Sequence, residues 1–359
     1  NLQKTLQRNN NIEILRIIAM FMIIAGHAIT HTDIYNNVGE INFYFVKFFD
    51  IIFNVATNVY VVISGYLLCE KTFKIKKVFN LWFQILFYSV IIYLVLIITN
   101  QIDFSLTSLV KVLMPISGNQ YWFARVYLGL YILSPFLNIL IKSLNQKQFQ
   151  CLLVVLTILF SLWGSFIPFA TTLNAEGGNS IIWFCVLYMF AAYIKIYGVP
   201  LKSNKALIGL TMSFFAFAFV SSVVLKKLSL MIGLGGKGAS QFTTFNSFTM
   251  LFGAVGLLCI AVKLPHINKF SKVIQWFSLS TFSVYLIHDN KYLRNILWEF
   301  LRIDAIADEF YIVPYILLTS VAIFVVCVCL DKVIYIPLNK FVSNISFKKL
   351  QSKIDSYII

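Results

Sequence analysis

Apolar residues fall into about ten long stretches along the chain, separated by short polar or basic loops. Most of these stretches approach the ~20 residues that a helix needs to cross the ~30 Å hydrocarbon core of a bilayer. The pattern predicts an all-α fold, with a single integral membrane domain over residues 1–359 and about ten transmembrane helices. These predicted helices cover residues 12–30, 43–69, 79–99, 121–141, 149–169, 180–197, 205–225, 243–262, 274–288 and 311–330.

Composition supports a membrane protein over a soluble one. Hydrophobic residues make up 59% of the 359 residues and charged residues only 12%, whereas soluble domains carry about 25% charged residues. The formal net charge of +15 would, in a soluble protein, suggest nucleic acid as a partner. Here Lys and Arg gather in the loops between apolar stretches, so we expect a lipid bilayer as partner and no nucleic acid.

The distribution of Lys and Arg over the loops predicts the orientation in the membrane, because these residues favour the cytoplasmic side. The even-numbered loops and both chain ends are basic, as in Lys71–Lys77 after the second stretch. Most odd-numbered loops are poor in Lys and Arg. The ninth sets Lys291, Arg294 and Arg302 against five carboxylates, and only the seventh, which holds Lys226, Lys227 and Lys237, breaks the alternation. We therefore predict a multi-pass protein of the cell membrane with both termini in the cytoplasm.

Two ionisable residues, Arg16 and His27, lie inside the first apolar stretch. An ionisable group in a membrane span is costly and by default marks a functional site. A separation of 11 residues is about three helical turns and ~16 Å of rise, so both share one helix face at opposite depths. Alternatives remain: Arg16 can extend to the head groups or pair with Glu13, and His27 can be a structural hydrogen-bond donor.

Further polar residues are expected at the external depth of His27. His31 follows one turn later, and Arg125 and His288 lie at the external ends of the predicted fourth and ninth helices. Histidine is the side chain most easily tuned to act as a base near neutral pH. The sequence thus predicts that three of the four histidines lie at one depth, although His31 is better explained as a solvated or structural residue at a helix end.

The cytoplasmic depth carries a second group of candidates. Lys74, Lys76 and Lys77 in the second loop suit phosphate groups as point charges, and they are equally explained as a topology signal. Ser64 lies beside Gly65 at the end of the second predicted helix. We interpret Ser64 as a packing or ligand-contact residue and not as a nucleophile, because no His and Asp partners lie near it in sequence.

The six cysteines are scattered, mostly within apolar stretches. They form no CxxC pair and show no zinc-type spacing, so we expect neither disulfides nor a metal site.

Four motifs in order make the chain resemble the membrane-bound acyltransferase family 3, and the resemblance covers nearly the whole chain. The first motif is Arg16 followed by His27, and the second is a helix end followed by a basic loop. The third opens the fourth helix, and the fourth closes the ninth. The last three read Ile63-Ser64-Gly65-Tyr66-Leu67, then Gln120-Tyr121-Trp122-Phe123 with Gly129-Leu130-Tyr131-Ile132-Leu133-Ser134-Pro135-Phe136, and Phe282-Ser283-Val284-Tyr285-Leu286-Ile287-His288.

The resemblance implies an O-acyltransferase that moves an acyl group, usually acetyl, from cytoplasmic acyl-CoA to a hydroxyl of an extracytoplasmic or lipid-linked glycan. The essential pair of the family falls on Arg16 and His27. With acetyl-CoA as donor, the candidate contacts are Arg16, Lys74, Lys76, Lys77 and Ser64. The candidates for substrate or oxyanion contact are Arg125, His288 and Trp122. Family members often have arginines where this basic loop has lysines.

In this interpretation His27 acts either as a general base or as a transient acyl carrier. The alternative function is a transporter or flippase for a glycan or lipid-linked sugar, in which polar residues line a path through the membrane. The two halves of the chain show no convincing repeat of the kind that many transporters carry. The sequence leaves open the acceptor glycan, the acyl group and the oligomeric state, a homo-oligomer included.

The loop charges generate a test of topology. A cysteine placed at Lys74 is expected to react with a membrane-impermeant thiol reagent only from the cytoplasmic side, and one placed at Asn174 only from the external side. Labelling of both positions from outside would contradict the predicted orientation.

Overall fold

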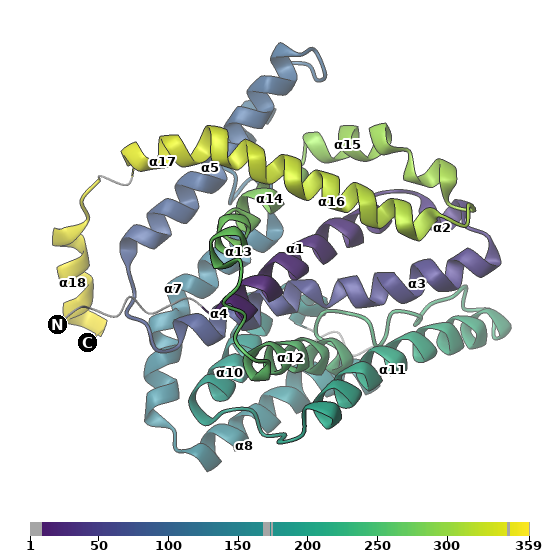
Figure 1. Cartoon of the computed structure of the whole chain (residues 1–359), viewed down its shortest axis with the longest axis horizontal. Helices are drawn as coiled ribbons and strands as arrows, with labels where there is room; N and C mark the ends of the chain where they lie inside the picture. The colour runs from purple at the N-terminus through teal and green to yellow at the C-terminus, as the bar shows by residue number, and fades with distance from the viewer. Residues whose placement is uncertain (1–8, 168–172, 174, 343–344, 359) are drawn as a thin grey trace.

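The computed structural model describes residues 9–167, 173, 175–342 and 345–358, and within these ranges it contains helices and no strand, which confirms the all-α prediction. Figure 1 shows most of the helices gathered into one bundle, with α18 at its edge. In chain order they are α1 Asn10–Thr30, α2 Ile34–Asn37, α3 Glu40–Asn54, α4 Ala56–Leu68, α5 Ile75–Ile98, α6 Leu106–Leu113, α7 Trp122–Ser143, α8 Gln146–Thr157, α9 Trp163–Phe166, α10 Ile181–Tyr197, α11 Asn204–Met231, α12 Phe248–Lys263, α13 Ser271–Ser278, α14 Thr281–His288, α15 Leu293–Leu301, α16 Ile312–Leu330, α17 Ile336–Val342 and α18 Lys348–Ile358. Short π-helical segments (Ile158–Leu162, Asp331–Tyr335) and 3-10 segments (Ala175–Gly178, Ile303–Ile306) lie between them.

The predicted count of about ten spans is not confirmed. Seven helical segments of the described residues are long and apolar enough to cross a membrane, which makes this a multi-pass membrane protein. Two further predicted spans, 180–197 and 243–262, correspond to the shorter apolar helices α10 and α12. Residues 168–169, at the end of the predicted fifth span, and Asn174 lie outside the described residues.

The predicted ninth span, over residues 274–288, is broken into the two short helices α13 and α14. The break falls among hydroxyl side chains: Thr281 Oγ1 donates to the carbonyl of Ser278 at 2.8 Å. Hydroxyl side chains that bond to nearby backbone groups compete with continuous helix. A stretch that is apolar on average therefore folds as two helices.

α1 packs against α3, α4, α12, α13, α14 and α16. Asn11 fixes the position of α1 along the axis of that helix. The Asn11 amide donates to the carbonyl of Leu264 at 2.9 Å and to that of Ala261 at 3.2 Å, and its Oδ1 accepts from the Ile267 N–H at 3.2 Å. The carbonyls at the end of α12 have no partner within that helix, so one buried amide both satisfies them and positions α1.

α14 is held in place by a buried carboxylate. Asp331 begins the π-helical segment after α16 and is only 2% exposed. It accepts hydrogen bonds from Tyr88 of α5, at 2.7 Å, and from Ser283 of α14, and Gln84 in turn donates to Ser283. Buried networks with every member partnered rigidify the elements they join. The network therefore ties α14, which ends at His288, to α5 and α16.

Gly65 lets α4 approach α10 closely. A Cβ on Gly65 would lie 2.8 Å from the Cα of Tyr188 and 2.9 Å from its carbonyl oxygen. Small residues at helix interfaces permit this kind of backbone approach in membrane proteins. The packing interpretation of the Ser64-Gly65 pair therefore has a direct structural basis.

Gly65→Ala is expected to lower the free energy of unfolding by ~1–3 kcal/mol. The added methyl group would overlap backbone atoms of Tyr188, which cannot move away as a side chain can by changing its rotamer. The matched control is Gly209→Ala on α11, where a Cβ meets nothing within 4 Å. Thermal unfolding in detergent should show a lower midpoint for Gly65→Ala and an unchanged or slightly raised midpoint for Gly209→Ala. Equal midpoints for the two variants would show that the close approach is not needed.

Candidate active site

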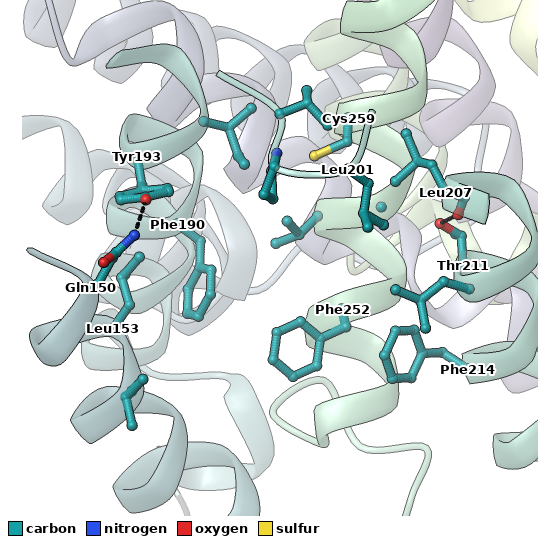
Figure 2. A pocket seen from close by; sticks show the side chains of 17 residues that line it. Gln150, Leu153, Phe190, Tyr193, Leu201, Leu207, Thr211, Phe214, Phe252 and Cys259 are labelled. Atoms are coloured by element: carbon teal, nitrogen blue, oxygen red, sulfur yellow. Dashed lines mark hydrogen bonds between the residues drawn. The ribbon is translucent and has the colours of Figure 1, made fainter. Parts of the chain in front are cut away.

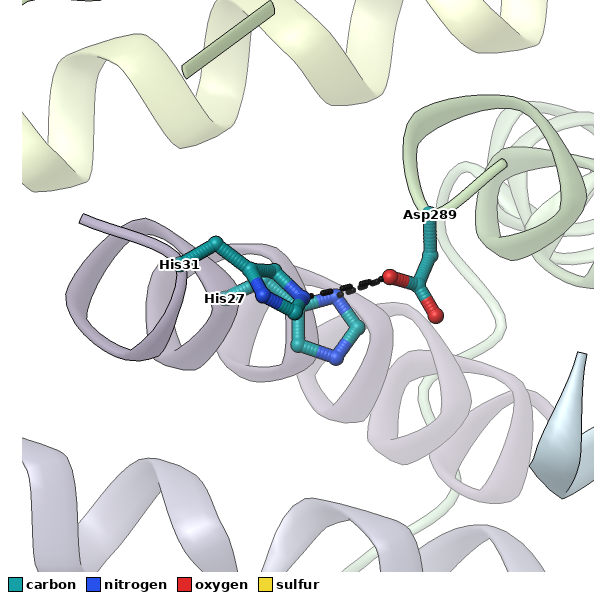
Figure 3. Close-up of side chains that lie close together, drawn as sticks. All are labelled: His27, His31 and Asp289. Atoms are coloured by element: carbon teal, nitrogen blue, oxygen red, sulfur yellow. Dashed lines mark ion pairs between the residues drawn. The ribbon is translucent and has the colours of Figure 1, made fainter. Parts of the chain in front are cut away.

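Three histidines meet at the end of α1. His27 and His31 lie one turn apart on this helix, and His288 is the last residue of α14. The His27 ring centroid lies 4.9 Å from that of His31 and 5.1 Å from that of His288. Figure 3 shows the His27 and His31 rings turned toward Asp289, which follows His288. The three histidines that the sequence predicts at one depth are thus in contact, because His27 lies next to both His31 and His288.

The hydrogen bonds of the cluster determine which ring nitrogens carry protons. Nδ1 of His288 lies 2.6 Å from the Val284 carbonyl, which can only accept, so this Nδ1 carries a proton. In a neutral His288 ring Nε2 is then an acceptor, and it lies 3.0 Å from Nδ1 of His27. His27 therefore donates from Nδ1, and its Nε2 keeps a free lone pair.

Asp289 places a negative charge beside these rings. Its Oδ1 lies 3.3 Å from Nε2 of His31, 3.8 Å from Nδ1 of His27 and 3.6 Å from Nη1 of Arg294. Burial alone would raise the pKa of Asp289, which lies beyond the end of α14, but the facing imidazoles of His27, His31 and His288 lower this pKa to about 2. The carboxylate is therefore ionised at neutral pH and favours positive charge on its neighbours.

The turn after α14 is fixed by two buried side chains. Asn290 Nδ2 donates to Tyr121 Oη at 2.7 Å, and Tyr121 Oη donates to the Leu286 carbonyl at 2.9 Å. Asn290 Oδ1 accepts from the backbone N–H of Tyr292, which immediately precedes α15. These bonds connect α7, α14 and α15, so His288, Asp289 and Arg294 keep one geometry relative to each other.

A cavity of about 260 Å³ opens beside the cluster. His27, His31, Asp289 and Arg294 contribute to its wall, with Asp50, Asn54, Thr57, Trp122 and Asn179 as further polar or aromatic lining residues. The indole of Trp122 stacks on Phe245, with ring centroids 5.9 Å apart and planes 21° apart. Asp50 accepts from Tyr35 Oη at 2.7 Å and from Lys47 Nζ at 3.1 Å. The cavity thus combines a basic nitrogen with hydrogen-bonding groups and an aromatic wall.

A larger cavity of about 610 Å³ lies between α8, α10, α11 and α12 (Figure 2). Apolar side chains such as Leu153, Phe190 and Phe252 dominate its lining. The amide of Gln150 donates to Tyr193 Oη at 2.6 Å. No histidine, carboxylate, lysine or arginine is among the described residues that line it. It therefore lacks the groups needed for acid–base chemistry, and the histidine cavity is the candidate active site.

Several residues singled out in the sequence lie away from the histidine cavity. Arg16 forms an ion pair with Glu13 at 2.7 Å, which is one of the alternatives given above. Ser64 donates to the Tyr60 carbonyl at 3.0 Å and lies 3.1 Å from Tyr127 Oη. Arg125 is exposed on α7 and does not line the cavity, whereas its neighbour Trp122 does.

The basic loop is fixed at its own place in the fold. Tyr131 Oη lies 3.3 Å from both the backbone N and the backbone O of Lys74, and the Lys77 ammonium lies 5.9 Å from the centre of the Tyr131 ring. Lys74 and Lys76 line a separate cavity next to α18. Arg16 does not line that cavity, so the structure does not bring together all the cations predicted to hold the donor.

Sequence reasoning missed Arg294 and Asp50. Arg294 is the one lysine or arginine among the described residues lining the histidine cavity, and it takes the place expected for Arg125. In the sequence Arg294 is only a loop charge, because its position depends on how α15 folds back beside α14. Asp50 lies inside the predicted second span, so the argument applied to Arg16 and His27 could have identified it.

Metal ligation was not expected from the sequence spacing. In the structure one ligand atom each from His27, His31 and Asp289 lies within 4.8 Å of the others. Imidazole and carboxylate are suitable zinc ligands. The hydrogen bond from His27 Nδ1 to His288 already occupies one of the ring atoms. The described geometry is thus that of a hydrogen-bonded chain, and a cation using His27 Nδ1 would have to replace the bond to His288.

A family model described as an acyltransferase domain matches residues 9–332. The match includes every residue of the histidine cluster and its cavity, and it ends before α17 and α18. No curated protein and no solved structure matches the chain.

The deduced proton positions can be tested by ¹⁵N NMR of the histidine-labelled protein, which has only four histidines. We expect His27 as the Nδ1–H tautomer in the native protein, and a loss of this preference in His288→Phe, because the acceptor that selects it is gone. The signals of the exposed His266 should be identical in both proteins. An Nε2–H tautomer for His27 in the native protein would overturn the deduced chain.

Proposed function

The chain belongs to the acyltransferase family whose domain model matches residues 9–332, and on this premise we propose a specific reaction. The protein transfers an acyl group, with acetyl-CoA as the expected donor, to a hydroxyl of an extracytoplasmic or lipid-linked glycan. The observation that carries the proposal is the free Nε2 lone pair of His27, oriented by His288 at the edge of a polar and aromatic cavity.

In the proposed reaction His27 is a general base. The acceptor hydroxyl oxygen bonds to the thioester carbonyl carbon while its proton moves to His27 Nε2. The carbon–sulfur bond then breaks, and the same proton passes to the sulfur, which leaves as the CoA thiol. General-base catalysis of this kind contributes ~10²–10⁴-fold in rate.

The surroundings of His27 favour the base role over an acyl-carrier role. A general base becomes an imidazolium during the reaction, and the ionised Asp289 with an oxygen 3.8 Å from Nδ1 stabilises that charge. The hydrogen bond to His288 keeps the ring orientation while the proton is held on Nε2. A base supported in this way by a partner and a carboxylate follows the general logic of catalytic triads.

The same cavity offers groups for the other needs of acyl transfer. A tetrahedral intermediate places negative charge on the former carbonyl oxygen, and a fixed cation or hydrogen-bond donor stabilises it. We assign this task to Arg294 ahead of Arg125, because Arg294 lines the cavity. Asp50, Asn54 and Trp122 supply acceptors, donors and an aromatic face, which together suit a sugar.

The donor is proposed to enter from the opposite end of α1. Arg16 lies ~16 Å along the helix from His27 by the rise per residue, and Lys74 and Lys76 line a cavity next to α18. Lysines suit the phosphates of CoA, and its slender pantetheine arm would extend between helices toward His27. This arrangement requires both termini in the cytoplasm, as the loop charges predict.

His27→Ala is expected to lower glycan acylation by ~10²-fold or more, the loss expected for a removed general base. CoA binding and expression should remain. His31→Ala, one turn further along α1, should lose much less, and His266→Ala, far from the cluster in an exposed loop, should lose nothing. The measurement is mass spectrometry of surface glycans from cells that carry each variant, reporting both glycan quantity and acyl content.

The same measurement separates the enzyme from a transporter. A transporter with His27 in its path would export less glycan in His27→Ala cells while the acyl content per glycan stays the same. Full acyl content in His27→Ala cells would refute the base assignment.

A further inference from the structure

The C-terminal helix α18 lies beyond the residues that the family model matches, and it folds back onto the basic loop between α4 and α5. One side chain makes the connection. Gln351 Nε2 donates to the Phe73 carbonyl at 3.0 Å, and Gln351 Oε1 accepts from the Ile75 N–H at 2.9 Å. Ile75 begins α5, so its N–H has no partner within that helix. The amide of Gln351 therefore bonds to the backbone on both sides of Lys74.

A cavity of about 760 Å³ lies between the loop and the C-terminal segment. Three lysines line it: Lys74 and Lys76 from the loop side, and Lys348 from α18. One carboxylate, Asp355, also lines it, and its Oδ1 accepts from Gln351 at 2.7 Å. The ammonium groups outnumber the carboxylate, so the cavity suits a ligand with several negative charges.

The cavity also has aromatic walls. Phe73 and Phe347 both line it, one from each side. Phe73 packs against Tyr131 with ring centroids 5.5 Å apart, and Phe347 packs against Phe79 at 5.0 Å. Aromatic rings held by neighbours are platforms on which a planar base stacks. Lysines and aromatic rings together match a phosphorylated nucleoside better than a phosphate group alone.

We propose that α18 completes the binding site for the phosphorylated adenosine end of acyl-CoA. Lys348 is a phosphate-binding residue of this site, and Gln351 is a positioning residue that holds α18 on the loop. This inference rests on the proposed function, which supplies acyl-CoA as the donor. A phospholipid head group also carries phosphate, but it has no base for the aromatic walls.

The test is calorimetric titration of the full-length protein in detergent with free CoA and with S-acetylpantetheine, which lacks the nucleotide. Lys348→Ala is expected to weaken CoA binding by about 5- to 10-fold, the scale of one partly exposed charge-assisted contact. Gln351→Leu should weaken CoA binding similarly, because α18 loses both bonds to the loop. Neither variant should change the affinity for S-acetylpantetheine.

The matched control is Lys353→Ala, which removes the same charge from an exposed position of α18 that does not line the cavity. It should bind CoA like the native protein. Thermal midpoints of all variants are measured alongside, so that a loss of CoA affinity is interpreted only for folded protein. If Lys348→Ala and Gln351→Leu bind CoA as tightly as Lys353→Ala, the role of α18 is wrong, while the proposed acyl transfer stands.

Two further outcomes would each overturn a different part of the argument. If the native protein binds no CoA, the proposed function and this inference fail together. A phospholipid head group, as the alternative phosphate ligand, is tested in lipid nanodiscs of phosphatidylcholine or phosphatidylglycerol. If the anionic lipid displaces CoA and only lipid binding depends on Lys348, the cavity holds a lipid head group and the nucleotide assignment is overturned.

Discussion

Lipid offers no hydrogen bonds, so a polar side chain inside this helical bundle is costly unless it finds a partner on the protein, and this constraint determines how several of the helices pack. Asn11 bonds to the end of α12 and sets the position of α1 along its axis. Glu13 neutralises Arg16 on the same helix. Asp331 connects α5, α14 and the end of α16. Apolar packing fills the rest of the bundle but does not by itself select one register.

The contact between His27 and His288 depends on these supports. α14 carries His288, and its two ends are held by different networks: Ser283 bonds to Asp331, while Tyr121 and Asn290 fix the last turn. Because the backbone carbonyl of Val284 orients His288, the proton on His27 is placed on Nδ1 and the lone pair on Nε2. Side chains without any chemical role thus decide which nitrogen of His27 can accept a proton.

The two polar cavities lie in different parts of the molecule and have different chemistry. The cavity beside His27 holds hydrogen-bonding groups, an aromatic wall and one arginine, whereas the cavity beside α18 holds lysines and phenylalanines. A donor with a charged end and a long slender arm reconciles the two, because its phosphates and its reacting carbonyl need different surroundings. The first cavity lies within the family match, and the second includes residues after it.

The sequence by itself determined the features that depend on neighbouring residues. Long apolar stretches identified the helical membrane class, and helical periodicity placed Arg16 and His27 on one face of α1. Contacts between distant segments were decided only by the tertiary structure, because helix rotation and packing are not encoded in local periodicity. It brought His288 within hydrogen-bonding distance of His27, turned Arg294 and not Arg125 into the cavity, and laid α18 on the basic loop. The break in the predicted ninth span, by contrast, has a local cause: the Thr281 hydroxyl bonds to the Ser278 carbonyl, which average hydropathy does not register.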